Sequence, residues 1–211
     1  MRVVKDAKER KNEILDVAER LFCTKGFDNT STNDILKEIG IARGTLYYHF
    51  KSKEEILDAM IERLSNEITS KATSIALDES IPVLKRLTNT ILSLNLDNDM
   101  GHMIMEQVHR PQNALLHQKM EESLLAKVNP LITKIIKDGI NEGICKTKYP
   151  EEAVEMLMIY SNIVFDGAKE YDKENKENKE RKVAGFIFNT ERILGMEEGS
   201  LLETMVPMFA K

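Results

Sequence analysis

Hydrophobic positions recur with a helical period near the start of the chain. Between about residues 5 and 25, the apolar side chains of Ile14, Val17 and Leu21 fall on one face of a helix. Gly26 follows this segment, and glycine readily supplies the left-handed residue at which many helices end. The pattern therefore predicts an amphipathic helix that stops at Gly26.

Two shorter helices are predicted directly after the first one. Ser31 and Asp34 have the spacing of a capping box, in which two side chains satisfy backbone N–H groups at the start of a helix. Gly40 ends this second helix. A third helix covers about residues 43–50, and its period turns Leu46 toward the interior.

The remainder of the chain keeps the helical pattern. A fourth and longer helix is capped by Ser52 and runs to about residue 76. Further helices are predicted at about residues 82–95, 99–109, 112–142, 150–171, 181–194 and 199–208. The highly charged stretch from Asp172 to Lys182 is predicted to be a solvated connection or frayed helix ends.

Composition supports a helical protein that works in water. The 211 residues include only 10 Gly and 5 Pro, and 42% of them are hydrophobic. The longest apolar runs fall far short of the ~20 residues that span a bilayer, and no signal peptide is recognised. We therefore expect a cytoplasmic protein with no membrane partner. Cys23 and Cys145 lack CxxC spacing and neighbouring His clusters, so we expect no disulfide, metal or cofactor.

Charge is distributed unevenly along the chain. The formal net charge is −5, which by itself argues mildly against binding to nucleic acid. Residues 1–53, however, hold 11 Lys and Arg against 8 Asp and Glu, whereas the remainder holds 19 against 27. The basic N-terminal part is therefore the candidate for contact with phosphate.

Two short helices joined by a turn that contains Gly40 form the pattern of a helix-turn-helix. In such a motif the second helix lies in the major groove of DNA, and its N-terminal residues meet the base edges. Those residues are Arg43, Gly44 and Thr45 here. A guanidinium donates to guanine, a threonine offers a hydroxyl and a methyl group, and a glycine lets the backbone approach closely. The geometry alone does not decide the function, because helix pairs with a short turn also occur in all-helical proteins that do not bind DNA.

The residues of this segment resemble the TetR family of repressors. The resemblance rests on Thr30-Ser31-Thr32-Asn33-Asp34-Ile35 and on Gly40-Ile41-Ala42-Arg43-Gly44-Thr45-Leu46-Tyr47-Tyr48-His49-Phe50-Lys51-Ser52-Lys53-Glu54-Glu55-Ile56, and it covers about residues 8–60. It implies base reading near Asn33, Arg43, Gly44 and Thr45. It also implies phosphate contacts from Ser31, Thr32, Tyr47, Tyr48, His49 and Lys53, where Ser31 and Thr32 offer free N–H groups at a helix N-terminus.

One position departs from the family pattern. The family usually has Ser or Thr where this chain has Ala42, and that side chain caps the recognition helix. Alanine at an N-cap costs about 0.5–2 kcal/mol of local stability and removes one hydroxyl that can contact phosphate.

The resemblance also implies a two-domain, all-α fold. We expect a three-helix, helix-turn-helix DNA-binding domain in residues 1–53 and a larger helical domain for effector binding and dimerisation in residues 54–211. After residue 60 the resemblance is architectural. Residues 153–165 are apolar nearly all round, and residues 183–194 have the same character, so these helices are expected to pair with those of a second copy. The predicted interface residues are Ile159, Ile163, Phe186, Ile187 and Ile193; a single monomeric core is the alternative.

Similar proteins keep an effector cavity in the larger domain. The candidate lining residues are mostly flexible or aromatic side chains: Met60, Leu64, Met103, Gln107, Met120, Leu124, Met156, Tyr160 and Phe165. Each of these residues, taken alone, is more often part of a plain hydrophobic core. His102, Glu106 and His109 share one helix face with a spacing that suits a divalent metal, but a solvated stripe explains them better.

The sequence as a whole predicts a dimeric regulator of transcription. We expect it to bind double-stranded operator DNA as a homodimer and to act as a repressor that a small-molecule effector releases. An enzyme on a helical scaffold is the first alternative, but the chain has only four His and no Gly-rich phosphate loop or nucleophile motif. A module that binds only proteins is the second alternative, and it requires the outer face of residues 43–48 to be buried.

Overall fold

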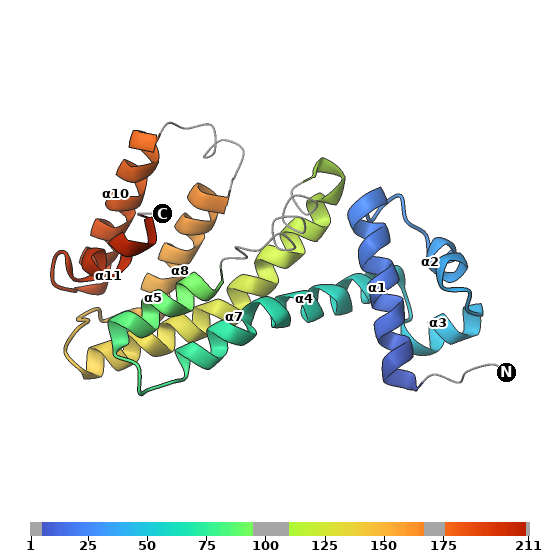
Figure 1. Ribbon diagram of the computed structural model, residues 1–211, viewed down its shortest axis with the longest axis horizontal. Helices are drawn as coiled ribbons and strands as arrows, with labels where there is room; N and C mark the ends of the chain where they lie inside the picture. The colour runs from blue at the N-terminus through green and yellow to red at the C-terminus, as the bar shows by residue number, and fades with distance from the viewer. Residues whose placement is uncertain (1–5, 95–109, 167–175, 210–211) are drawn as a thin grey trace. The chain divides into compact units, whose positions relative to one another are not determined.

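The computed structural model describes residues 6–94, 110–166 and 176–209. Its elements, in chain order, are α1 (Ala7–Lys25), α2 (Thr32–Ile39), α3 (Arg43–His49), α4 (Lys53–Ala76), α5 (Val83–Ser93), the 3-10 turn η1 (Pro111–Asn113), α7 (Ala114–Asn141), α8 (Pro150–Ser161), the π-helical turn η2 (Asn162–Asp166), α10 (Lys176–Leu194) and α11 (Ser200–Phe209) (Figure 1). The described residues contain no strand, and the all-α prediction is confirmed. The helix predicted at residues 99–109 lies outside the described residues.

Helix α10 begins earlier than the sequence suggested. It starts at Lys176, inside the charged stretch that we expected to be a connection or frayed ends. Lys and Glu are good helix formers, and Lys176 and Glu180 form an ion pair of 3.7 Å between residues one turn apart. Charge density was thus a poor guide to the helix boundary in this segment.

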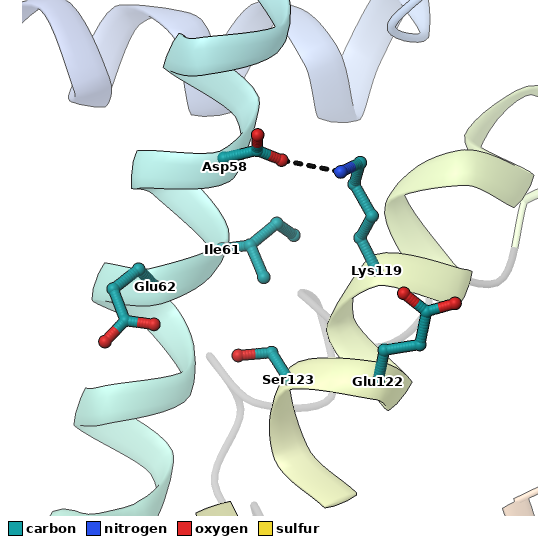
Figure 2. Close-up of a pocket in the computed structure, with 6 residues that line it drawn as sticks. All are labelled: Asp58, Ile61, Glu62, Lys119, Glu122 and Ser123. Carbon is teal, nitrogen blue, oxygen red and sulfur yellow. Dashed lines mark hydrogen bonds and ion pairs between the residues drawn. The ribbon is translucent and has the colours of Figure 1, made fainter. Parts of the chain in front are cut away.

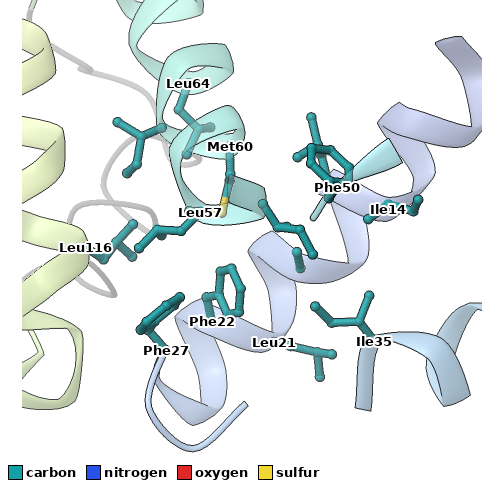
Figure 3. Close-up of a cluster of buried hydrophobic side chains, with 14 of the residues drawn as sticks. Ile14, Leu21, Phe22, Phe27, Ile35, Phe50, Leu57, Met60, Leu64 and Leu116 are labelled. Atoms are coloured by element: carbon teal, nitrogen blue, oxygen red, sulfur yellow. The ribbon is translucent and has the colours of Figure 1, made fainter. Parts of the chain in front are cut away.

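The described residues pack into two compact units, and the first contains residues 6–68 and 110–124. Its core gathers apolar side chains from α1, α2, α3 and the start of α4, among them Ile14, Phe22, Ile35, Leu46 and Leu57 (Figure 3). Leu116 and Met120 of α7 belong to the same cluster, as Figure 3 shows for Leu116. The DNA-binding head expected from residues 1–53 therefore has a core that later parts of the chain complete. The division expected at residues 53 and 54 stays a prediction.

The turn after α1 is held closely against η1. Gly26 has a φ of 88°, a conformation that L side chains rarely adopt, and a Cβ placed there would lie 3.1 Å from the backbone oxygen of Gln112. The buried side chain of Asn113 donates from Nδ2 to the carbonyl oxygen of Cys23 over 3.2 Å. The C-terminus of α1 is thereby tied to a segment that lies about ninety residues later.

The second unit contains residues 69–94, 125–166 and 176–209. Its core includes Leu87 of α5, Ile135 of α7, Val154 of α8 and Ile187 of α10. Five of the eleven residues of α5 are buried, namely Val83, Arg86, Leu87, Thr88 and Thr90, whereas Lys85, Asn89 and Leu92 are exposed. Helix α5 therefore packs one side into the core and leaves the other side open.

A buried arginine forms a charge network in the second unit. Arg86 is 2% exposed, and its Nη2 donates to Oδ2 of Asp138 over 2.6 Å. Lys134 donates to the same carboxylate oxygen and to Oε1 of Glu79, in both cases over 2.9 Å. The Nε and Nη1 atoms of Arg86 have no hydrogen-bond partner among the described residues. Asp138 is thus the described anion that compensates the buried guanidinium.

A buried glutamate organises the end of the second unit. The carboxylate of Glu191 accepts hydrogen bonds from the backbone N–H groups of Gly199 and Leu201, over 2.9 and 2.8 Å, and of Leu202 over 3.2 Å. These donors lie at the start of α11, where backbone N–H groups lack partners within the helix. Glu191 therefore caps α11 and fixes the turn that precedes it.

Within the described residues, no helix combines the length and the apolar character that crossing a membrane requires.

Candidate nucleic-acid interface

The turn between α2 and α3 has the geometry that the sequence predicted. Gly40 ends α2 in the left-handed region, with φ of 73° and ψ of 35°. The N–H groups of Gly40 and Ile41 both donate to the carbonyl oxygen of Leu36, over 2.9 and 3.3 Å. These two bonds satisfy the last carbonyl groups of α2, and α3 begins at Arg43 after only three intervening residues.

Helix α3 is anchored by its apolar side and leaves its other side open. Leu46 is fully buried, and Phe50 directly after the helix is nearly so. Arg43 and Gly44 are exposed, Thr45 is partly exposed, and Tyr48 is 80% exposed. A module that binds only proteins was expected to bury this face. The open face instead suits insertion into a groove of DNA.

The start of α2 carries the predicted capping box. The N–H of Asp34 donates to Oγ of Ser31 over 3.1 Å, and the N–H of Ser31 donates to Oδ2 of Asp34 over 2.8 Å. The hydrogen bonds from the side chain and backbone of Ser31 lower the pKa of the Asp34 carboxyl. The N–H of Ser31, which we expected to be free for phosphate, is therefore occupied within the protein. Thr32 and Asn33 follow as the first two residues of α2.

The missing cap on α3 is confirmed. Ala42 stands at the N-cap with extended φ and ψ of −71° and 148°, and no side-chain hydrogen bond caps the helix. The backbone of Ala42 still accepts a bond of 2.9 Å from the N–H of Thr45. The recognition helix thus starts without the hydroxyl that its family usually provides.

Arg43 and Tyr47 lie against each other on the outer side of α3. The guanidinium carbon of Arg43 is 5.3 Å from the centre of the Tyr47 ring. Hydrogen bonds from the side chains of Thr32 and Arg43 lower the pKa of the Tyr47 hydroxyl. The phosphate contact that was expected of Tyr47 stays a prediction.

Lys53 and His49, which were also expected to contact phosphate, both have neighbours within the protein. The Lys53 ammonium donates to the carbonyl oxygen of Phe27 over 2.8 Å and lies 4.1 Å from the centre of the Phe27 ring. His49 is partly buried, and its ring meets that of Tyr48 edge to face at 5.0 Å. Lys53 therefore holds the loop after α1, a role that its position in the sequence did not reveal.

The expected effector residues fall into both units. Met60, Leu64 and Met120 are buried in the core of the first unit, and Leu124 packs against that core. The remaining described candidates belong to the second unit: Met156 and Tyr160 are exposed, and Phe165 is partly exposed. Met103 and Gln107 lie outside the described residues, as do His102, Glu106 and His109. The pocket itself stays a prediction.

Two grooves occur that the sequence did not suggest. The first has a volume of about 310 Å³ and is lined by α4 and α7 within the first unit (Figure 2). Its lining residues are Asp58, Ile61, Glu62, Lys119, Glu122 and Ser123, and Lys119 bonds Asp58 over 2.6 Å. The second, of about 480 Å³, is lined by α7 and α8. Both are rich in charged residues, which in sequence look like an ordinary solvated helix face.

Most of the expected interface residues are at the surface of the second unit. Ile163 is 72% exposed, Ile159 and Ile193 are also exposed, and Phe186 is partly buried. Ile187 is the exception, because it is 2% exposed and packs in the core of its own unit. The interface itself, with Ile187 among its residues, stays a prediction.

Cysteine and metal chemistry have little support in the described part of the chain. Cys23 and Cys145 are free thiols, and burial raises the pKa of each to about 11. Such thiols stay protonated and unreactive near neutral pH. The described residues contain no group of three His, Cys, Asp or Glu side chains that could hold a metal ion.

Family models match both parts of the chain. Residues 14–60 match the model described as "Bacterial regulatory proteins, tetR family", and residues 98–188 match the "Tetracyclin repressor-like, C-terminal domain". The second match shows that a sequence signal extends beyond residue 60, where we expected only a likeness of architecture. The helix-turn-helix described above lies within the first match.

Relatives and solved structures agree with these matches. The uncharacterized HTH-type transcriptional regulator YhgD of Bacillus subtilis (strain 168) is 30% identical over 188 residues, which cover 85% of this chain and 93% of the relative. An HTH-type transcriptional regulator of Staphylococcus aureus (strain USA300) is 48% identical over 59 residues, or 28% of this chain and 32% of the relative.

The fold is also that of solved TetR-family structures. A TetR-family transcriptional regulator from Mesorhizobium loti MAFF303099 has a TM-score of 0.63 and 17% identity, over 90% of this chain and 98% of that one. The flavonoid-responsive regulator FrrA has a TM-score of 0.59 and 16% identity, over 88% and 96% of the two chains. Together with the open face of α3, these matches show that the chain is a DNA-binding transcriptional regulator, not an enzyme, and that it belongs to the TetR family.

Proposed function

We propose that the protein is a homodimeric repressor that a small-molecule effector releases from its operator. The observation that carries this proposal is the open face of α3, where Arg43, Gly44 and Thr45 begin a helix that buried Leu46 holds on the head. Two such helices in a dimer fit successive major grooves about 34–36 Å apart, so the operator is nearly palindromic. The protein acts in the cytoplasm, where the bacterial chromosome lies.

The exposed apolar side chains of the second unit support a second copy as the partner. Met156, Ile159 and Ile163 are exposed along α8 and η2, and Phe188 and Ile193 are exposed on α10. Exposed apolar patches often mark interaction sites, and symmetric dimers are the commonest assemblies of soluble proteins. Ile159, Ile163, Phe186 and Ile193 form the proposed interface.

The family match and the apolar residues of the first unit support control by an effector. The chain matches the C-terminal domain model of the family, and one structural relative is described as flavonoid-responsive. Met60, Leu64, Met120 and Leu124 are the candidates for lining the pocket within the first unit. An effector that prefers a conformation unsuited to DNA lowers operator affinity by that preference, and DNA weakens effector binding equally.

The contact between η1 and α1 offers a route for this control inside the first unit. Asn113 bonds the last turn of α1 at Cys23, and Gln112 packs against Gly26. A displacement of residues 110–124 therefore acts on α1 directly. The coupling is a proposal that operator titrations with and without effector test.

A binding experiment tests the proposed function. Full-length protein is titrated onto labelled DNA fragments from around its own gene, at stated salt, with random DNA as the competitor. We expect one fragment to bind specifically. Arg43→Ala is expected to weaken the binding of that fragment by about 1–3 kcal/mol, because the contact with one base pair is lost. Arg20→Ala is the matched control, because Arg20 pairs with Glu38 outside α3. Failure of every fragment to bind above competitor contradicts the proposal.

The direction of regulation needs a second measurement. A reporter gene under the bound fragment is expected to rise when the regulator gene is deleted, and the addition of effector is expected to raise it in the intact strain. A fall in reporter expression after deletion identifies an activator instead.

A further inference from the structure

Tyr47 lies one helical turn after the residue that we expect to read a base. The guanidinium carbon of Arg43 is 5.3 Å from the centre of the Tyr47 ring, within the range of a cation–π contact. Residues four apart share one face of a helix, so this pairing follows from the register of α3. The ring of Tyr47 therefore supports the guanidinium of Arg43 from the C-terminal side.

The hydroxyl of Tyr47 is engaged as well. Its pKa is lowered because it accepts hydrogen bonds from the Thr32 side chain and from Arg43. Thr32 is the first residue of α2, so the contact connects the starts of the two helices in the motif. A phenolic oxygen that accepts such bonds keeps its own O–H available to donate to a DNA phosphate.

The start of α3 gives this connection extra importance. Ala42 provides no side-chain cap, so the recognition helix lacks the usual local bond at its N-terminus. Arginine is long and has many rotamers, and a free arginine must lose that freedom when it binds a base. A stacked and hydrogen-bonded arginine has already lost part of it, which improves discrimination between bases.

We propose that Tyr47 is a positioning residue for Arg43. In this arrangement the guanidinium is presented in a fixed orientation for bidentate contact with a guanine. The inference rests on the proposed function, and it adds a second role to the phosphate contact that the family resemblance implied for Tyr47. Loss of the Tyr47 hydroxyl then reduces sequence choice more than it reduces affinity for DNA in general.

A double-mutant cycle distinguishes positioning from phosphate contact. Full-length wild type, Tyr47→Phe, Arg43→Ala and the double variant are titrated onto the operator and onto an operator changed at the base pair that Arg43 reads. We expect Tyr47→Phe to lower the ratio of the two affinities about 3- to 10-fold in the wild-type background, and to have no effect on that ratio when Arg43 is absent.

Further measurements separate the positioning role from a loss of folding and from a general loss of DNA affinity. Tyr48→Phe changes a neighbouring tyrosine that does not stack on Arg43, and it is expected to weaken both DNA sequences alike. Thermal unfolding checks that each variant is folded. In the protein without DNA, NMR titration of labelled tyrosine is expected to show a higher pKa for Tyr47 in Arg43→Ala and in Thr32→Val.

The possible failures are separable. If the wild type binds no operator, the proposed function fails and the role of Tyr47 fails with it. If the wild type binds its operator but Tyr47→Phe weakens all sequences alike, or acts equally without Arg43, only the positioning role is overturned. An unchanged Tyr47 pKa in Arg43→Ala likewise counts against it.

Discussion

At the scale of single residues, the most consequential side chain in the second unit is charged. Arg86 is almost completely buried on α5, and Asp138 on α7 is the described carboxylate that bonds it. Sequence patterns indicate apolar cores well, but they gave no sign that an arginine lies inside this one. The reason is that Arg and Lys are exposed in most helices, so a pairing 52 residues away is invisible to local periodicity.

Removal of the acid from this pair is expected to be costly. Asp138→Ala leaves the Arg86 guanidinium buried without its counter-charge, and such changes lower the free energy of unfolding by about 3–5 kcal/mol. Urea unfolding followed by circular dichroism measures the loss. Glu79→Ala is the control, because Glu79 pairs with Lys134 at the surface, where a pair contributes about 0–1 kcal/mol. Equal losses in the two variants contradict the buried role of Arg86.

The same carboxylate predicts a dependence on pH. Burial by itself raises the pKa of Asp138, but the hydrogen bond and charge of Lys134, with the charge of Arg86, outweigh it and lower the pKa below its ordinary 3.8. A lowered folded-state pKa contributes stability above about pH 4 that disappears as the pH falls through the folded value. Melting temperatures from pH 6 to pH 3 are expected to fall less in Asp138→Asn than in the wild type. Parallel curves contradict this assignment.

At the scale of elements, the helix-turn-helix could be predicted almost completely from sequence. Ser31 with Asp34, Gly40 and the missing cap at Ala42 all occur as local spacing indicated. What local spacing could not indicate is where side chains turn once the helices pack. Lys53 bonds the carbonyl oxygen of Phe27, 26 residues earlier, because a neighbour distant in sequence decides that contact.

Restoration of the family's usual cap on α3 is expected to stabilise the head. Ala42→Ser places a hydroxyl at an N-cap with extended backbone, where it accepts a bond from the second or third N–H of the helix. A gain of about 0.5–2 kcal/mol in unfolding free energy is expected. Ala126→Ser is a suitable control, since it makes the same exchange at an exposed position within α7. A gain in both variants, or in neither, argues against a missing cap.

At the scale of the whole molecule, dimerisation is the prediction that most needs a measurement. Ile163 is 72% exposed and belongs to the proposed interface. Ile163→Glu places a charge where a second copy is expected to bury an apolar side chain, so we expect light scattering to shift from twice 24.1 kDa to 24.1 kDa at micromolar concentration. Operator affinity is expected to fall with it, because one recognition helix replaces two.

Leu77→Glu is the matched control for that experiment. Leu77 is an exposed leucine just beyond α4 and outside the proposed interface. It should change neither the mass nor the operator affinity. A wild type that already scatters as a 24.1 kDa species contradicts the homodimer outright.

The close approach of Gln112 to Gly26 affects how regulators of this kind can be recombined. Leu116 and Met120 complete the core of the head, and Gly26 leaves room for the backbone of η1. In a chimera that joins the first 68 residues to the C-terminal domain of another regulator, side chains of that regulator would therefore pack against the head at these positions. Its folding would depend on that junction more than on the match between the recognition helix and its operator. Transplantation of the short segment 110–124 together with the head is the way to preserve both.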